Sequence, residues 1–398
     1  MIQQRLGILP SGWGWARFGD VARLVNGRAY SQPELLDKGT PVLRIQNLNG
    51  GANWYYSDLT LDSDKYCDEN DLLFAWSATF GPYWWSGPRA IYHYHIWKVL
   101  PGAQLDKRYA FYALRWVTKV VKDAAHGVTM VHMTKAGMEE CKIPFPPLPE
   151  QRRIADILDK ADAIRRKRKE AIALTEELLR SAFLEMFGDP VTNPKGWPVK
   201  PLGELLDAIE SGWSPVCESR PAKNDEWGVL KLGAVTFGRY DANENKALAA
   251  DLLPVPELQV KAGDVLFSRK NTYEHVAACV FVADTRPKLM LPDLIFRFVL
   301  AKTSGLRPET LWGLLSNRRM RKRVQGLAGG TAGSMPNISK ERLKTVKVPV
   351  PPTPVQEGFA GAMRGSEATR AALEAAARDS EQLFNSIVSR AFSGGLSA

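Results

Sequence analysis

The feature of this sequence that most limits its fold is an internal repeat. Two proline-rich segments, IPFPPLP at residues 143–149 and VPVPPTP at residues 348–354, align with each other. In the same alignment Gln151 matches Gln356, which lies 205 positions later. Shorter matches occur upstream, between residues 42–45 and 229–232 and between residues 71–74 and 264–267. The offset differs from one match to the next, as insertions in the loops would produce. Only two copies at this spacing argue against a solenoid and indicate one unit used twice.

Each copy is predicted to be a globular part followed by a long helix. The repeat divides the chain at residues 1–148, 149–189, 190–352 and 353–398. Between Pro149 and Phe187 the sequence has neither glycine nor proline and is rich in good helix formers. Gly188 and Pro190 then supply stop signals. At ~1.5 Å per residue such a helix would be roughly 55 Å long. A chain of 398 residues is also too long for one ordinary core, so we expect separate domains.

Apolar and small residues recur every seven positions in both predicted helices. A heptad repeat is typical of a coiled-coil seam, and small residues let two backbones approach closely. An adjacent row that starts at Ile154 is interrupted by Arg168. We therefore predict that the two helices pack against each other through Ile157, Ile164, Ala171, Leu178, Ala362, Thr369, Ala376 and Leu383.

The globular parts are mixed in character. Short β-like runs occur at residues 41–45, 72–76, 265–268 and 276–282, and helix-like stretches at 107–123, 293–301 and 307–325. The predicted fold class is α+β. It has two similar mixed α/β globular domains, separated and joined by two long antiparallel coiled-coil helices.

The charge of the chain is unevenly distributed. The net charge is +10, from 53 basic and 43 acidic residues. Residues 190–352 contain 24 basic and 16 acidic residues, a net charge of +8, residues 1–148 carry +3, and the helical segments are close to neutral. Such a surplus favours a polyanionic partner, most often nucleic acid. The basic run at residues 165–169 is either a solvated helix face or a phosphate contact.

Two groups of side chains are predicted to contact DNA. Arginine, lysine and asparagine read the edges of guanine and adenine, and a loop that follows a strand holds them firmly. The predicted base contacts are Arg44, Gln46, Asn47 and Ser77 in the first globular part, and Lys231, Arg269, Lys270 and Asn271 in the second. The densest basic cluster is predicted to bind the phosphate backbone through Arg318, Arg319, Arg321, Lys322 and Arg323.

The sequence contains no catalytic motif that we can identify. Residues 326–333 (GLAGGTAG) lack the lysine of a P-loop, and no HExxH or amino-methyltransferase motif occurs. His93 and His95 could be two metal ligands, but a plain strand is the favoured interpretation, and no metal site is predicted. The aromatic run at 80–85 could stack an unpaired base, although packing is favoured. Four separate cysteines without a CxxC fit a reducing cytoplasm.

One family resemblance covers essentially the whole chain. Residues 143–151 (IPFPPLPEQ) and the helix that follows them resemble the specificity subunit of type I restriction–modification enzymes. The second copy, VPVPPTPVQ at residues 348–356, is similar but has Thr353 and Val355 where the first copy has leucine and glutamate. Residues 39–48 (GTPVLRIQNL), 228–235 (GVLKLGAV) and 263–272 (GDVLFSRKNT) also resemble the recognition domains of that family.

The resemblance implies a non-catalytic reader of a bipartite, asymmetric DNA target. Each globular part would be a target recognition domain, and the helices would space the two domains. The helices would also dock two methyltransferase subunits, which in turn recruit motor–nuclease subunits. This chain would bind no cofactor, whereas S-adenosylmethionine, ATP and Mg would belong to the partners. A cytoplasmic location without a membrane is expected. Two alternatives stay open: a specificity subunit of another restriction class, and a self-sufficient DNA-modifying enzyme with an unrecognised active site.

Overall fold

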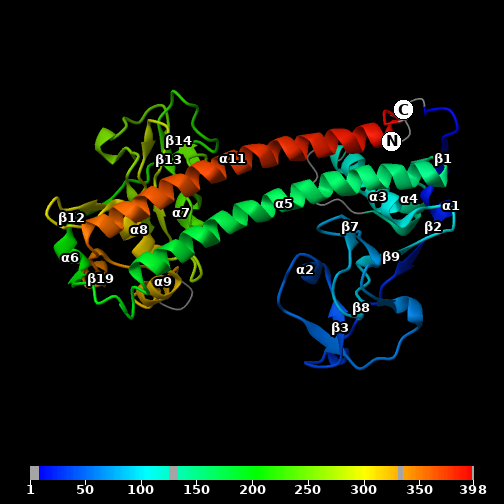
Figure 1. Cartoon of the computed structure of the whole chain (residues 1–398), viewed down its shortest axis with the longest axis horizontal. Helices are drawn as coiled ribbons and strands as arrows, with labels where there is room; N and C mark the ends of the chain where they lie inside the picture. Colours follow the sequence, from blue (N-terminus) through cyan, green and yellow to red (C-terminus); the bar gives the residue numbers. More distant parts are fainter. Residues whose placement is uncertain (1–8, 125–132, 330–334, 397–398) are drawn as a thin grey trace. The chain divides into compact units, whose positions relative to one another are not determined.

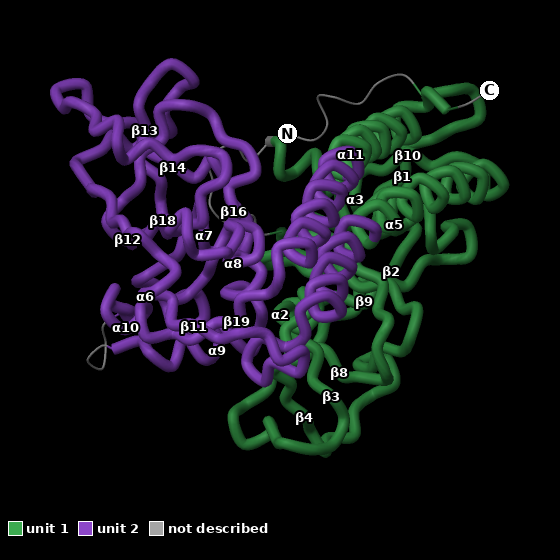
Figure 2. Tube along the Cα trace, turned by 60° about the vertical axis from the view of Figure 1, so that its left-hand side comes forward, with its two compact units in different colours: residues 1–170, 374–398 green, residues 171–373 purple. Residues whose placement is uncertain are grey.

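The computed structural model describes residues 9–124, 133–329 and 335–396. Its chain divides into two compact units (Figure 2), residues 1–170 with 374–398 and residues 171–373. The division passes through both long helices, α5 (Leu148–Phe187) and α11 (Thr353–Phe392) (Figure 1). Each unit therefore contains a globular part and about half of each helix. The helix expected between Pro149 and Phe187 is confirmed.

Unit 1 contains three sheets. In the first, β1 (Gly14–Arg17) pairs antiparallel with β10 (Lys142–Phe145), so the start and the end of the globular part lie together. The second has the order β2 (Ala22–Asn26), β9 (Ile96–Pro101), β6 (Leu72–Ala75), β7 (Gly81–Trp84). The third has the order β4 (Tyr55–Ser57), β3 (Thr40–Leu43), β8 (Ala90–Tyr92), β5 (Tyr66–Cys67), with β3 and β8 parallel. The α-helices of this globular part are α1 (Phe18–Val21), α2 (Ile45–Leu48), α3 (Lys107–Ala124) and α4 (Lys135–Glu139).

Unit 2 repeats this arrangement. Its closing pair is β11 (Val199–Pro201) with β19 (Lys347–Pro349). Its larger sheet has the order β12 (Leu206–Ser211), β18 (Ile295–Leu300), β15 (Val265–Ser268), β16 (Cys279–Phe281). Its smaller sheet has the order β14 (Asn245–Ala247), β13 (Gly228–Leu230), β17 (Leu289–Met290), with β13 and β17 parallel. Its α-helices are α6 (Leu202–Leu205), α7 (Gly233–Thr236), α8 (Pro308–Ser316), α9 (Arg318–Gln325) and α10 (Lys340–Lys344). The sequence repeat is therefore a repeat of the fold.

Each unit has its own hydrophobic core, and the long helices contribute to both. The first turns of α5 place Ile154 and Leu158 in the core of unit 1, where Phe384 of α11 is also buried. The last turns of α5 place Phe183 in the core of unit 2, against Phe359 of α11. Burial of these large side chains, at about 1.5–3 kcal/mol each, fixes the helix ends to their domains.

A buried glutamine holds the start of each long helix. Gln151 Nε2 donates to the carbonyls of Gln104 (3.0 Å) and Pro146 (2.9 Å), and its Oε1 accepts from the Asp106 N–H (2.9 Å). The side chain is fully buried, so these three bonds have no competition from water. The amide thus joins the helix to the loop that precedes α3.

Gln356 makes the same three bonds in unit 2. Its Nε2 donates to the carbonyls of Gly305 and Pro351, each at 2.7 Å, and its Oε1 accepts from the Arg307 N–H at 2.8 Å. It too is fully buried. The match of Gln151 with Gln356 in the sequence is thus a match of geometry.

Within each unit the two long helices run antiparallel and in contact. In unit 1, Arg165 of α5 pairs with Glu381 of α11 at 3.1 Å, and Arg168 donates to the Ala376 carbonyl and the Ser380 hydroxyl. In unit 2, the Ser366 hydroxyl donates to the Thr175 carbonyl at 3.4 Å. On α5, Arg168 and Thr175 belong to the row that starts at Ile154, and Arg165 lies directly beside that row.

The predicted row of packing residues is therefore wrong in part. Ile164, Leu178 and Leu383 are 52%, 69% and 60% exposed, and Ala362 and Thr369 are exposed as well. Only the other three residues of the row are half-buried, namely Ile157, Ala171 and Ala376.

The correction has a physical reason. Arg168 interrupts the adjacent row in the sequence, but arginine can bury its aliphatic stem and keep hydrogen bonds for its head group. Here the guanidinium finds two acceptors on α11, so the seam accommodates the charge. The heptad row that looks like a seam lies at its side, on the surface.

Two secondary-structure predictions also change. Residues 293–301 contain the strand β18 rather than a helix, because Ile295, Phe296, Phe298 and Val299 favour strand and pair with both β12 and β15. The helix predicted at residues 307–325 is confirmed as two helices. Asn317 separates them and caps α9 by accepting from two backbone N–H groups.

Candidate nucleic-acid interface

One edge of each unit has the same backbone arrangement. In unit 1 the loop after β2 crosses the end of β8 at Gly27, where a Cβ atom would collide with the carbonyls of Tyr92 and His93. In unit 2, Gly212 follows β12 and meets the carbonyl of Leu291 in the same way. Only glycine allows these approaches. The loops that follow the two parallel strands are therefore gathered at one edge in both units.

The unit 1 edge carries Arg44 directly after β3. Its guanidinium lies over the Tyr55 ring at 4.2 Å and donates to the Asn53 carbonyl at 3.2 Å. Exposed Gln46 donates to the same carbonyl at 3.1 Å. Arg44 and Gln46 thus lie at the edge, as predicted, in positions fixed by the loop of residues 49–54.

Two predicted base contacts of unit 1 are buried instead. The Asn47 amide donates to the carbonyls of Gly51 (3.2 Å) and Asn53 (2.9 Å), and its side chain is 7% exposed. Ser77 is buried as well. In this conformation Asn47 shapes the loop that presents Arg44 and does not itself reach a ligand.

The unit 2 edge has different side chains at equivalent places. Lys231, directly after β13, pairs with Glu244 at 2.9 Å. Arg269 follows β15 with its guanidinium over the Phe296 ring at 5.3 Å. Lys270 forms an isolated backbone bridge with Asn337. The two edges share a backbone arrangement and differ in the chemistry of their side chains.

Asn271 is also buried, so the prediction that it contacts a base directly is not met in this conformation. Its amide donates to the hydroxyls of Thr236 (3.1 Å) and Ser268 (3.3 Å). The residue therefore ties the loop after β15 to α7. Its burial resembles that of Asn47, since in both units an asparagine amide stabilises a loop of the edge.

The basic cluster on α9 divides into paired and exposed cations. Arg318, Lys322 and Arg323 are exposed. Arg319 pairs with Asp189 at 2.6 Å, and Arg321 is half-buried and donates to the Glu274 carbonyl at 2.8 Å. Burial lowers the pKa of the Arg321 guanidinium. Arg319 is exposed as well but is held by Asp189, so Arg318, Lys322 and Arg323 are the cations placed to bind phosphate without breaking an ion pair in the described part of the chain.

The basic run at residues 165–169 is largely engaged within the protein. Arg165 and Arg166 both pair with Asp162, at 2.7 and 3.1 Å, and Arg168 lies in the helix seam. Lys167 and Lys169 are exposed. The interpretation as a helix face balanced by nearby acids fits these contacts.

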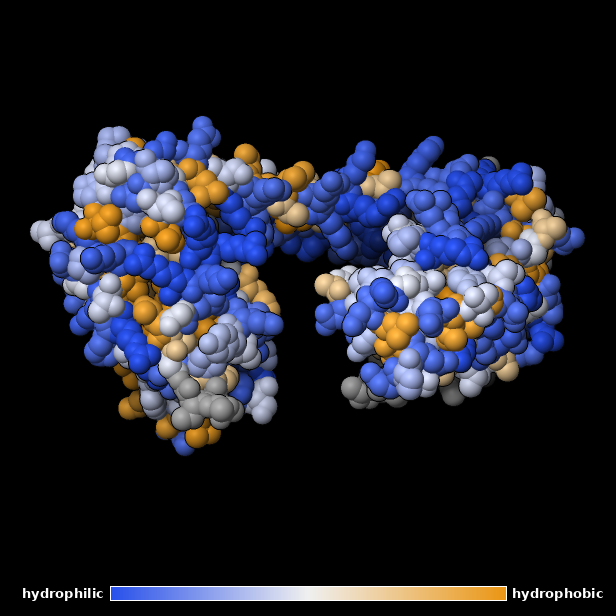
Figure 3. Space-filling view, turned by 90° about the horizontal axis from the view of Figure 1, so that it is seen from below, coloured by the Kyte–Doolittle hydropathy of each residue, from blue (hydrophilic) through white to orange (hydrophobic). Residues whose placement is uncertain are grey.

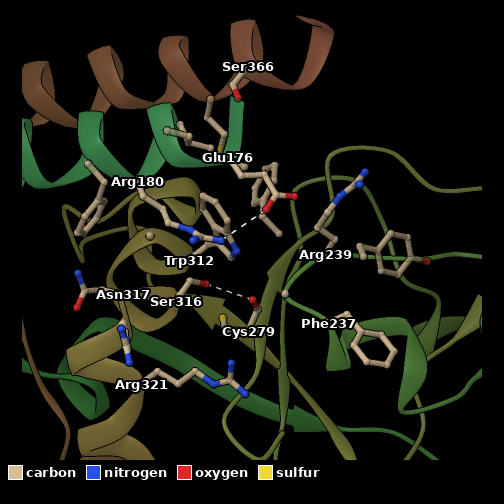
Figure 4. Close-up of a pocket in the computed structure, with 18 of the residues that line it drawn as sticks. Glu176, Arg180, Phe237, Arg239, Cys279, Trp312, Ser316, Asn317, Arg321 and Ser366 are labelled. Carbon is tan, nitrogen blue, oxygen red and sulfur yellow. Dashed lines mark hydrogen bonds and ion pairs between the residues drawn. The ribbon is translucent and has the colours of Figure 1, made fainter. Parts of the chain in front are cut away.

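A hollow of about 1000 Å³ lies beside α9 in unit 2. Figure 4 shows Arg180 and Glu176 of α5 on one side of it, with Arg321 of α9 and Trp312 of α8 on others. Phe237, on the loop after α7, lies at its border and is 77% exposed. Sequence reasoning missed this hollow because its walls come from elements far apart along the chain.

The His93 and His95 pair belongs to an aromatic cluster at the unit 1 edge. Their ring centroids are 4.9 Å apart, and Trp76 packs edge-on against His95 at 5.0 Å. Burial, then His95 and Arg44, lower the pKa of His93 to about 4. Among the described residues no group of three potential metal ligands occurs. In the run at 80–85, Phe80 and Trp85 are buried, whereas Trp84 is 37% exposed and stacks on Phe111, so packing accounts for only part of the run.

Comparison with known proteins agrees with this arrangement. A family model, the type I restriction modification DNA specificity domain, matches residues 10–174. That match covers less than half of the chain, and over these residues the chain is similar to the specificity subunits of type I restriction–modification enzymes. The resemblance inferred from the sequence is thus confirmed.

Named specificity subunits match the chain over different lengths. The Escherichia coli EcoEI specificity subunit is 34% identical over 168 residues, which are 42% of this chain but 28% of that subunit. The Methanocaldococcus jannaschii MjaVIII specificity subunit is 25% identical and the match spans 88% of this chain and 85% of that subunit. These names agree with the prediction of a recognition subunit rather than an enzyme.

A solved specificity subunit supports the fold along nearly the whole chain. The type I S subunit from M. genitalium matches with a TM-score of 0.53 at 13% identity and covers 96% of both chains. A chain from a structural study of type I complex assembly matches with a TM-score of 0.56 at 19% identity, over 98% of this chain. On the face seen in Figure 3, the surface of each unit is mainly hydrophilic with separate hydrophobic patches. No helix in the described part of the chain is long and apolar enough to cross a membrane.

Proposed function

We propose that this chain is the specificity subunit of a type I restriction–modification complex and reads a bipartite, asymmetric DNA target. The observation that carries the proposal is the duplicated edge. Gly27 and Gly212 fix the same backbone geometry in the two units. The side chains at equivalent positions differ, as with Arg44 over Tyr55 in unit 1 and Lys231 paired with Glu244 in unit 2. Two domains with the same backbone but different side chains at the contact positions can each recognise a different half of the DNA target.

Each globular part acts as a target recognition domain, with the boundaries 1–148 and 190–352. The segments 149–189 and 353–398 act as a coiled-coil spacer between the half-sites. Arg44, Gln46, Arg269 and Lys270 contact bases. Arg323, which is exposed on α9, contacts phosphate and strengthens binding to any sequence.

The exposed apolar row on the helices supports docking of partner subunits. Ile164, Leu178 and Leu383 are more than half exposed, and so is Leu174 of α5 beside this row. On α5 the exposed row that begins at Ile157 lies three residues after the seam row that begins at Ile154. On α11 the exposed row that begins at Ala362 lies three residues after the seam row that begins at Phe359. Because the helices are antiparallel, the two exposed rows of each unit face the same side of the pair. Apolar side chains of a heptad row that no residue in the described part of the chain covers are a surface for another helix.

The partners are two methyltransferase subunits, through which motor–nuclease subunits join the complex. S-adenosylmethionine, ATP and Mg bind to those subunits, and this chain recognises DNA without a cofactor in the cytoplasm. The same recognition would serve a specificity subunit of another restriction class, which only the partner subunits distinguish.

Selection from a random DNA library tests the proposal. The purified chain, alone and with its partners, is mixed with duplexes that carry a randomised region, and bound DNA is sequenced. Two short constant sequences separated by a fixed number of unspecified bases are expected. The same preparations are assayed for methyl transfer and cleavage. Activity of the chain alone would support the self-sufficient enzyme instead.

A further inference from the structure

The hollow beside α9 has walls of two kinds. Part of its lining comes from the globular part, through α8, α9, β16 and the loop after α7. The rest comes from α5 and α11, including Arg180, Leu184 and Ser366. A volume of about 1000 Å³ is at the upper end of the range of ligand sites, which suits several residues of an extended chain.

The floor of the hollow is apolar and rigid. Trp312 stacks on Phe359 with ring centroids 6.4 Å apart and planes at 19°, and Phe183 meets Phe359 edge-on at 5.5 Å. Met363 completes this floor. Phe183, Phe359 and Met363 are themselves buried, so half-buried Trp312 is the aromatic surface that an apolar side chain inserted from outside would cover.

The α9 wall is basic. Arg318, Arg321, Lys322 and Gln325 are spaced i, i+3, i+4 and i+7, so they share one face of α9, and all four line the hollow. Arg323 does not line it. Two faces of one short helix thus carry cations, but only one of them borders the hollow.

The charges around the hollow are unbalanced. Six basic side chains and four carboxylates line it. Glu176 pairs with Arg180 at 3.5 Å, and Glu367 pairs with Arg370. Half-buried Arg321 donates to the backbone carbonyl of Glu274 and faces no carboxylate within ion-pair distance among the described residues. A partly buried guanidinium without a counter-ion is stabilised by an incoming anion.

Protein fits the hollow better than DNA does. A duplex presents phosphates on a convex surface, so it can reach the rim cations but cannot fill an apolar floor formed by Trp312, Phe359 and Phe183. A peptide segment can do both, because it carries carboxylates and apolar side chains on one backbone. Leu184, which is 46% exposed, also connects the hollow with the exposed apolar residues of α5.

We propose that this hollow binds an acidic segment with an apolar anchor, contributed by the partner subunit that docks on α5. Its carboxylates meet Arg318, Arg321 and Lys322, and its apolar side chain covers Trp312. The inference rests on the proposed docking of a partner to the helices. It adds a second contact, through which the partner touches the recognition domain as well as the spacer.

Adjacent residues on α9 offer a matched pair of variants. Lys322→Glu reverses a charge inside the hollow, and Arg323→Glu reverses one outside it. Affinity of the full chain for the purified partner subunit is measured by fluorescence anisotropy, in the absence of DNA. We expect Lys322→Glu to weaken assembly about tenfold, the loss of one charge-assisted hydrogen bond, and Arg323→Glu to leave it unchanged. Binding of the isolated chain to DNA serves as the second readout.

The outcomes separate the possible occupants. Equal effects of the two variants on assembly would overturn the inference, and a loss of DNA binding confined to Lys322→Glu would assign the hollow to DNA. A photo-crosslinking residue at Phe237 should attach to an acidic segment of the partner in the full complex. Attachment to DNA alone would contradict the proposal. A wild-type chain that fails to bind the partner at all would refute the docking proposal itself.

Discussion

Replacing either buried glutamine with leucine should destabilise one unit and not the other. Gln151→Leu keeps nearly the same volume but removes three hydrogen bonds of 2.9–3.0 Å and leaves the Asp106 N–H and two carbonyls without partners. At about 1 kcal/mol for each lost bond, the free energy of unfolding of unit 1 should fall by about 3 kcal/mol. Gln356→Leu should cost unit 2 a similar amount, because its three bonds are the same.

Hydrogen exchange measured by mass spectrometry resolves the two units in the full chain. Gln151→Leu should speed exchange in α3 and the first turns of α5, whereas Gln356→Leu should speed it in α8 and the first turns of α11. The melting temperature should fall by about 6–12 °C for the affected unit. Gln382→Leu, on the exposed surface of α11, is the control and should change neither. A loss below about 0.5 kcal/mol for Gln151→Leu would refute the assignment of the glutamine as a clamp.

Three further predictions follow from the surface and the helices. Arg323→Ala should reduce the slope of log affinity for DNA against log salt concentration by about 1 without changing sequence preference, and an unchanged slope would remove Arg323 from the phosphate contacts. Insertion of one heptad in both helices, after Ala171 and after Ala376, keeps the seam in phase and adds ~10 Å, or about three base pairs of spacer, so the modified motif should lengthen or activity should disappear. The pKa of His93 is lowered to about 4 from an unfolded value near 6.5, so its contribution to stability is complete above about pH 6.5 and is lost as the pH falls toward 4. His93→Gln should flatten this acid dependence in a melting series, and an unchanged dependence would remove His93 as its source.

The sequence predicts the long-range organisation of this protein well because the repeat and the helix composition are local or periodic signals. Gln151 and Gln356 align, and the structure gives them identical bonds. The helix between Pro149 and Phe187 needs only the absence of breakers and a favourable composition.

The details that failed depend on contacts that periodicity does not contain. The choice between two heptad rows turned on Arg168, whose guanidinium finds acceptors on the other helix that only the fold brings near. Residues 293–301 form a strand because β12 and β15 pair with it on both sides. Asn47 and Asn271 have the right chemistry for reading bases, but burial directs their amides to the loops.

The candidate hollow could not be predicted from the sequence. The spacing of Arg318, Arg321 and Lys322 indicates a basic helix face, but not which residues it faces. Its apolar floor combines Phe183 of α5, Trp312 of α8 and Phe359 of α11. No motif links these positions, which become neighbours only when both long helices pack on the second globular part.

Methylation mapping of cellular DNA tests the central claim most directly. Cells that contain the partner subunits and either the wild-type chain, Arg44→Ala or Arg269→Ala are compared by sequencing that detects modified bases. The wild-type chain should yield a motif of two constant parts with a fixed spacer. Arg44→Ala should relax only one part and Arg269→Ala only the other, each by ~1–3 kcal/mol of discrimination. A single uninterrupted motif, or two variants that alter the same bases, would contradict the account of two units that each read one half-site.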